Sequence, residues 1–296
     1  MRLIVTDMDG TLLNSRREIS MENVEALLAA QNKGIEIAIA TGRTYGNALA
    51  LCQRVGLNPY IISNHGAFVY TKEGERILGI GINKSHVKDA LTWLSTNNYF
   101  YNLCTDRHSF IPANTNELFL NDYKTAKHLI FQVTEERVRE AIKIYQSMDG
   151  RTVINQMNDI LEQDLTFGSI TSITFDQDKL RMGREYFNTY PYLSMTVAGK
   201  DIFEMIHTSV SKGNALEHLS QHLRIPMEEI MAIGDNYNDI SMLERVGISV
   251  AIGNAEDEVK KICKHVSLSN DLNGVAYIVN KMLDEFSPNQ SIVERG

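Results

Sequence analysis

Short apolar runs alternate with amphipathic helical stretches at both ends of this chain. The apolar runs occupy residues 3–6, 35–40, 60–62, 230–234 and 250–253. Helical stretches span residues 20–33, 44–55 and 211–223, and the first is expected to bury Val24, Leu27 and Leu28 on one face. A strand, a helix and another strand in this order imply right-handed crossovers and a parallel sheet. The pattern therefore predicts an α/β fold with a doubly wound parallel sheet.

The pattern changes between residues 82 and 207. Here we expect helices at 84–95 and 179–187 and strands at 99–103, 109–112, 170–175, 193–197 and 202–207. These strands do not end in the Asp or Gly residues that follow the apolar runs elsewhere. The sequence thus predicts a core of residues 1–81 and 208–296 with an inserted α+β module of residues 82–207.

Length and charge narrow the classes of function. A chain of 296 residues suits two domains better than one, and its net charge is −8. An acidic chain is a poor match for nucleic acid or an anionic membrane, which select basic faces. A small phosphate ester is still compatible, since one metal ion and one lysine can dominate a local field. With three scattered cysteines and no long apolar stretch, we expect a cytoplasmic protein without disulfides. We expect it to be a monomer or a weak homo-oligomer.

Two aspartates follow the first apolar run. Only Met8 separates Asp7 from Asp9, and residues i and i+2 of an extended chain point the same way. Two carboxylates that close together need a cation, or a proton held on one of them. A strand that simply ends in a polar turn is the plainer alternative, because Asp and Gly favour turns.

Two more strands end in comparable chemistry. Thr41 follows the second run, and Asp235 follows the fourth. In a parallel sheet such ends converge, so Asp7 and Asp235 could offer Mg²⁺ the oxygen ligands it prefers. The Thr41 hydroxyl and the amides of the next helix could hold phosphate, while Lys212 could neutralise its charge. Taken alone, Thr41 could belong to an ordinary turn between a strand and a helix. Lys212 could likewise be a solvent-exposed charge in the first turn of a helix.

Taken in order, these residues resemble the motifs of the haloacid dehalogenase superfamily. The segments are Asp7-Met8-Asp9-Gly10-Thr11, Thr41-Gly42-Arg43, Lys212-Gly213 and Gly234-Asp235-Asn236-Tyr237-Asn238-Asp239. The chain is most similar to the Cof-type phosphatases (type IIB), whose large C2 cap is inserted between the second and third motifs. The resemblance implies a Rossmann-like core with an α+β cap and Mg²⁺-dependent hydrolysis of small phosphomonoesters through an aspartyl-phosphate.

The resemblance also implies a role for each motif residue. Asp7 resembles the nucleophile and a metal ligand, and Asp9 the general acid and base, with its backbone carbonyl on the metal. Asp235 would complete the metal ligands, with Asn236 nearby and Asp239 behind them. Phosphate would be bound by the backbone N–H groups of Met8 and Gly42 and by the side chains of Thr41, Lys212 and Asn238.

The resemblance leaves the substrate and one motif open. It suggests sugar phosphates, nucleotide-like phosphates or a phosphorylated flavin precursor. His65 stands before Gly66-Ala67 where such proteins often carry Asn, so we expect His65 to act at the hinge or to contact substrate. A phosphotransferase or mutase using the same aspartyl-phosphate, and a non-catalytic protein that binds a phosphorylated metabolite, are the alternatives.

Overall fold

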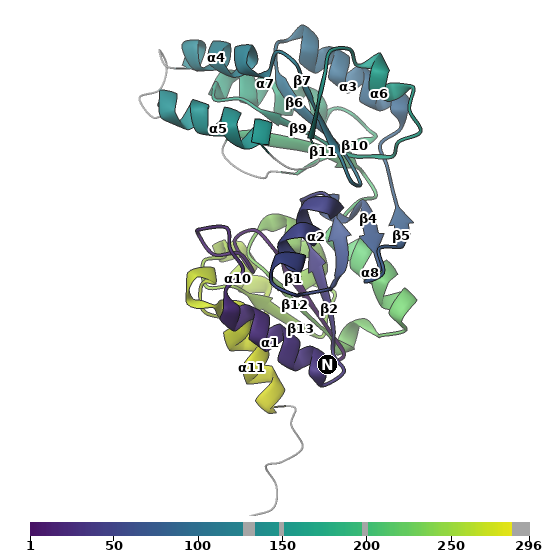
Figure 1. The fold of residues 1–296 in the computed structure, drawn as a ribbon, viewed down its shortest axis with the longest axis vertical. Coiled ribbons are helices and arrows are strands. Elements are labelled where there is room, and N and C mark those ends of the chain that lie inside the picture. Colours follow the sequence, from purple (N-terminus) through teal and green to yellow (C-terminus); the bar gives the residue numbers. More distant parts are fainter. Residues whose placement is uncertain (127–133, 148–150, 197–200, 286–296) are drawn as a thin grey trace, which may run out of the picture.

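The chain folds into two layers of α/β structure stacked along its long axis (Figure 1). This computed structural model describes residues 1–126, 134–147, 151–196 and 201–285. The predicted tail of the core beyond residue 285, and residue 197 of the predicted strand 193–197, lie outside these ranges. None of the helices in the described ranges has the length and apolar character that a bilayer crossing requires.

The lower layer, the core, is built on an eight-stranded sheet. Its strand order is β14-β13-β12-β1-β2-β3-β4-β5. The strands from β14 to β3 pair in parallel, which confirms the predicted doubly wound α/β fold. The bounds are β1 Leu3–Asp7, β2 Glu36–Ala40, β3 Tyr60–Ser63, β4 Phe68–Tyr70, β5 Arg76–Gly79, β12 Ile230–Gly234, β13 Ile248–Ala251 and β14 His265–Val266.

Helices flank this sheet, and α1 and α11 pack side by side (Figure 1). Ser20 caps α1, since its side chain accepts the Asn23 N–H. The prediction that Leu28 is buried is wrong, because Leu28 is 37% exposed. The buried stripe of α1 instead includes Asn23, whose Oδ1 accepts the Ala276 N–H of α11 at 2.8 Å. The helices are α1 Met21–Asn32, α2 Tyr45–Arg54, α8 Lys212–Leu223, α9 Ile240–Leu243, α10 Asp257–Ile262 and α11 Gly274–Glu285.

The register of the sheet brings three strand ends to one edge. Asp7 of β1 lies opposite Ala40 of β2, and Thr6 lies opposite Ile233 of β12. The residues that follow β2 and β12, Thr41 and Asp235, therefore lie beside Asp7. In open α/β sheets ligands bind beyond this edge.

The edge strands β4 and β5 are antiparallel, which the alternating pattern did not predict. Between β3 and β4 the chain reverses through a short 3₁₀ turn, η1 (Asn64–Gly66). Asn64 and His65 adopt φ of 47° and 59°, and Gly66 adopts 107°. Two consecutive non-glycine residues in the left-handed region are strained, and such strain clusters at functional sites.

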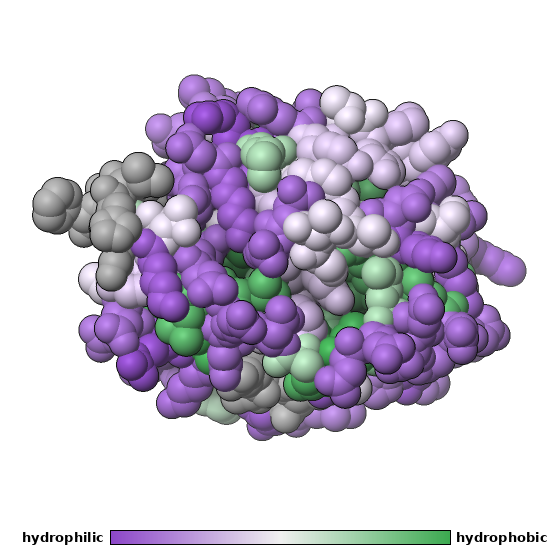
Figure 2. Space-filling view, turned by 90° about the horizontal axis from the view of Figure 1, so that it is seen from above, coloured by the Kyte–Doolittle hydropathy of each residue, from purple (hydrophilic) through white to green (hydrophobic). Residues whose placement is uncertain are grey.

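The upper layer, the cap, is a six-stranded sheet in the order β10-β11-β9-β6-β7-β8. Helices α3, α4 and α7 lie on its outer side, so its other face is turned toward the core (Figure 1). Seen from above, most residues are hydrophilic and apolar ones show in small separate areas (Figure 2). The bounds are α3 Lys84–Thr96, β6 Phe100–Thr105, β7 Ser109–Pro112, α4 Thr115–Ala126, α5 Glu135–Ser147, β8 Arg151–Ile154, α6 Asn158–Leu161, β9 Phe167–Ile173, α7 Gln177–Asn188, β10 Leu193–Thr196 and β11 Ile202–His207.

Candidate active site

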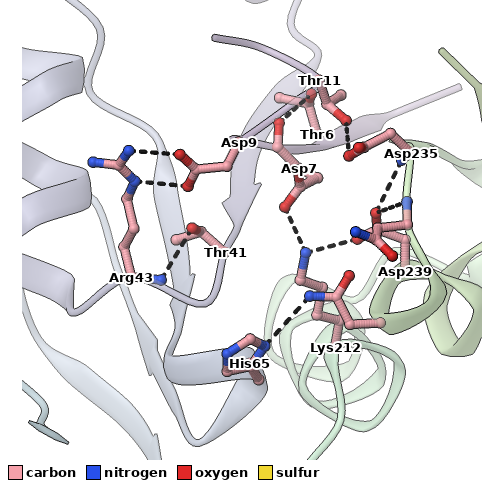
Figure 3. A network of polar contacts seen from close by, with 12 residues as sticks. Thr6, Asp7, Asp9, Thr11, Thr41, Arg43, His65, Lys212, Asp235 and Asp239 are labelled. Carbon is pink, nitrogen blue, oxygen red and sulfur yellow. Dashed lines mark hydrogen bonds and ion pairs between the residues drawn. The ribbon is translucent and has the colours of Figure 1, made fainter. Parts of the chain in front are cut away.

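Three carboxylates gather where β1 and β12 end. Oxygen atoms of Asp7, Asp235 and Asp239 all lie within 4.8 Å of one another (Figure 3). Asp7 is the last residue of β1, Asp235 follows β12, and Asp239 ends the short turn η3 (Tyr237–Asp239). Asp7 and Asp239 are buried, so their charges repel in a poorly solvated site.

Lys212 lies between two of these carboxylates. Its Nζ is 2.5 Å from Asp7 Oδ1 and 2.6 Å from Asp239 Oδ1, and its side chain is 1% exposed. The lysine is the first residue of α8, whose cap Ser211 accepts the N–H of Asn214. A buried ammonium is stable only beside such partners, and the two carboxylates raise the pKa of Lys212 above its ordinary value despite burial.

The single positive charge of Lys212 does not balance the three carboxylates of the cluster. Burial, reinforced by Asp239 and Asp235, raises the pKa of Asp7 well above its ordinary value. Burial and Asp239 likewise raise the pKa of Asp235 from 3.8 to about 6. Groups that resist ionisation in this way favour a bound cation.

The hydrogen bonds of the three carboxylates show which of them could bind a metal ion. Asp239 accepts Lys212 on one oxygen and the backbone N–H groups of Asp235 and Asn236, at 3.0 and 3.1 Å, on the other. Asp235 accepts the Thr11 hydroxyl at 2.8 Å. Asp7 and Asp235 are therefore the carboxylates whose placement and oxygen chemistry suit a hard cation such as Mg²⁺.

Gly10 allows the first loop to approach this cluster. Its φ is +83°, and a Cβ placed there would lie 2.5 Å from Asp235 Oδ2. Both the left-handed backbone and the close approach therefore require glycine. Two residues earlier, the Met8 side chain is fully buried in the core.

Asp9 points away from the cluster and pairs with Arg43 (Figure 3). The guanidinium donates to both oxygens of Asp9, at 2.6 and 2.7 Å. Thr41 is buried, and its Oγ1 accepts the Arg43 N–H at 3.1 Å. The loop after β2 thus holds Asp9 at the side of the site, with both its carboxylate oxygens engaged.

His65 connects the core to the cap. Its Nε2 lies 2.8 Å from Oε2 of Glu204, a buried residue of β11 in the cap. Burial opposes the charge on Glu204, but the His65 ring and the Thr171 hydroxyl lower its pKa below the ordinary value. The other ring nitrogen of His65 lies 3.4 Å from the amide nitrogen of Asn238. These contacts place His65 between cap and core, and a role at the hinge or in substrate contact stays a prediction.

Gly42 lies against the His65 ring, and a Cβ placed there would come within 2.5 Å of Cε1. Of the residues expected to bind phosphate, Thr41, Gly42 and Asn238 thus lie around His65, and Lys212 lies beside Asp7. Glu204 had no signal in the sequence, and the Thr41-Gly42-Arg43 motif did not indicate that Arg43 pairs with Asp9, because each contact joins residues far apart along the chain.

A cleft of about 410 Å³ lies between the two layers above these residues. Its floor includes Asp7, Asp9, Gly42 and Asp235 from the core. Its roof comes from the cap sheet and includes Asn102, Thr171, Glu204 and Arg151. A small molecule in this cleft would contact both layers at once.

A sequence profile described as haloacid dehalogenase-like hydrolase matches residues 4–279. Phosphatase YwpJ of Bacillus subtilis is 34% identical over 96% of this chain and 100% of its own length. The 5-amino-6-(5-phospho-D-ribitylamino)uracil phosphatase YwtE of the same organism is 32% identical, covering 96% and 98%. A solved haloacid dehalogenase-like hydrolase from B. subtilis superposes with a TM-score of 0.81 at 34% identity, covering 95% and 99%.

Proposed function

The chain belongs to the haloacid dehalogenase-like hydrolase family, and from that premise we propose that it is a Mg²⁺-dependent phosphatase of small phosphomonoesters. The observation that carries the proposal is the Asp7 carboxylate, held by Lys212 in a buried acidic cluster that opens on the cleft. Two relatives that match this chain along nearly its whole length bear the name phosphatase.

Asp7 is the nucleophile in this proposal. Its carboxylate attacks phosphorus in line with the leaving oxygen and forms an aspartyl-phosphate. Lys212 contacts Asp7 directly, so it orients the carboxylate and stabilises its charge before the attack. The same ammonium then faces the phosphoryl oxygens as negative charge moves onto them.

Asp9 is the general acid and base. It protonates the leaving alkoxide in the first step and takes a proton from the attacking water in the second. Because Arg43 holds both oxygens of Asp9, the pair must open before Asp9 reaches the leaving group. Substrate that enters the cleft beside Asp9 and Arg43 would separate them.

The remaining motif residues hold the phosphoryl group and the metal. Thr41, Lys212 and Asn238 would bind phosphate through side chains, and Met8 and Gly42 through backbone N–H groups. Mg²⁺ held by the carboxylates of Asp7 and Asp235 and the backbone carbonyl of Asp9 would neutralise charge on the phosphoryl oxygens. Asp239 would keep Lys212 and the loop after β12 in place, with Asn236 beside it.

The cap is where the proposal places substrate selection. We divide the chain into a catalytic core of residues 1–81 and 208–296 and a cap of residues 82–207. The cap lies above the core (Figure 1), and its residues line one side of the cleft. A volume of about 410 Å³ suits a small phosphorylated metabolite. With its three cysteines free, the protein fits the reducing cytoplasm where such metabolites occur.

The test is release of inorganic phosphate from a panel of small phosphomonoesters, with Mg²⁺ and with EDTA. We expect release that requires Mg²⁺ and disappears in Asp7→Asn, while the exposed Asp284→Asn on α11 behaves as the parent. Circular dichroism establishes that both variants fold. Phosphate transfer to an added alcohol without phosphate release would favour a transferase, and tight binding without turnover would favour a non-catalytic protein.

A further inference from the structure

A row of polar side chains crosses the cap sheet above the cleft. Glu204 of β11 lies opposite Thr171 of β9, which lies opposite Asn102 of β6. Two residues further along β6, Cys104 lies opposite Ser109 of β7. Ser109 in turn lies opposite Arg151 of β8, where the row ends. Residues i and i+2 of a strand share one face, and all six residues line the cleft.

At one end of this row, Glu204 is fully engaged within the protein. Its Oε2 lies beside His65 and its Oε1 accepts the Thr171 hydroxyl at 3.1 Å. At the other end, Arg151 Nε donates to the Ser109 hydroxyl at 3.2 Å. Protein contacts thus hold the charged residues of the row in place.

Asn102, in the middle of the row, is different. Its side chain amide donates to the Cys104 sulfur at 3.2 Å, and the residue is only 6% exposed. Its buried Oδ1 has no hydrogen-bond partner among the described residues. A folded chain seldom leaves a buried amide oxygen unpaired, because the lost hydration is not replaced.

The chemistry of the missing partner follows from the amide. Turning the amide over would bring Oδ1 to the Cys104 thiol and leave the NH₂ group unpaired instead. One end of Asn102 therefore lacks a partner in either orientation. A hydroxyl group satisfies both cases, since it donates to the oxygen or accepts from the nitrogen.

We propose that Asn102 is a specificity-determining residue that binds a hydroxyl group of the leaving alcohol. The inference rests on the proposed function, because the alcohol reaches the cap roof only when the phosphoryl group lies at Asp7 below it. Bound substrate completes the hydrogen bonds of Asn102, whereas an analogue without the hydroxyl leaves the buried amide unpaired. The site then discriminates against that analogue by about 10- to 100-fold in kcat/KM.

Matched esters measure this discrimination. The probes are glycerol 1-phosphate, erythritol 4-phosphate and ribitol 5-phosphate, each paired with the alkyl phosphate of the same carbon number. For at least one pair the parent is expected to prefer the polyol, and Asn102→Leu should lower that kcat/KM ratio by about 10- to 100-fold. Asn188→Leu, on the exposed end of α7, makes the same chemical change away from the cleft and should keep the ratio.

The outcomes separate the two proposals. A parent without preference in any pair, or an unchanged ratio in Asn102→Leu, overturns this inference and leaves the phosphatase standing. Failure of the parent to hydrolyse any ester with Mg²⁺ overturns both. Asn102→Leu removes the unpaired Oδ1 together with the weak hydrogen bond to Cys104, so its unfolding temperature should stay close to that of the parent. Should it misfold, Asn102→Ala serves as the second variant with the same expected ratio.

Discussion

Asp235 should make the metal-free protein less stable as pH rises toward neutrality. Burial and the neighbouring Asp239 raise the pKa of its carboxyl from 3.8 to about 6 in the folded chain. A carboxyl whose pKa is raised on folding binds its proton more tightly in the folded state than in the unfolded state. Its stabilising contribution is therefore present below about pH 4 and is lost as pH rises through about 6.

The size of this loss follows from the two pKa values. A shift from 3.8 to about 6 corresponds to about 3 kcal/mol of unfolding free energy. Asp235→Asn stays neutral at every pH and can still accept the Thr11 hydroxyl through its amide oxygen. In EDTA the variant should match the parent below about pH 4 and exceed its stability by up to about 3 kcal/mol at pH 7.

Urea denaturation from pH 4 to 8, in EDTA and in Mg²⁺, measures the difference. The exposed Asp284→Asn of α11 is the matched control and should follow the parent throughout. Mg²⁺ should stabilise the parent more at pH 7.5 than at pH 5, because it binds ionised carboxylates, and should stabilise Asp235→Asn much less. A difference between parent and Asp235→Asn that does not vary with pH would refute the reasoning.

Two further substitutions test the buried ammonium and the proposed acid. Lys212→Met should lower the unfolding free energy by about 3–5 kcal/mol, since it leaves two buried carboxylates uncompensated, and the exposed Lys281→Met should not. Urea denaturation measures both, and a loss as small as that of Lys281→Met would contradict the account. Asp9→Asn should reduce kcat far more for an alkyl phosphate than for p-nitrophenyl phosphate, whose leaving group needs little protonation. Equal losses in steady-state assays of the two esters would show that Asp9 is not the acid.

The sequence determined which residues lie at the binding edge of the core sheet. Three of the apolar runs are followed at once by the polar residues of a motif, so the end of each strand and its chemistry are adjacent in the sequence. The parallel arrangement follows from the alternation of strands and helices. Asp7, Thr41 and Asp235 could therefore be placed at one edge from local pattern alone, and the register of β1, β2 and β12 has them there.

Only the tertiary structure decided which partner each of the following side chains meets. Arg43 engages Asp9, and Glu204 of the cap meets His65 of the core, although 139 residues separate the latter two. The register of three cap strands leaves Asn102 buried with one end of its amide unpaired. Nothing near Glu204 or Asn102 in the chain marks either residue, and the motifs that contain Asp9 and Arg43 do not show that these two side chains pair. The pattern of apolar and polar residues that predicts a strand or a helix depends on neighbours within a few residues. These contacts, in contrast, form only when the two sheets have formed and the cap lies on the core.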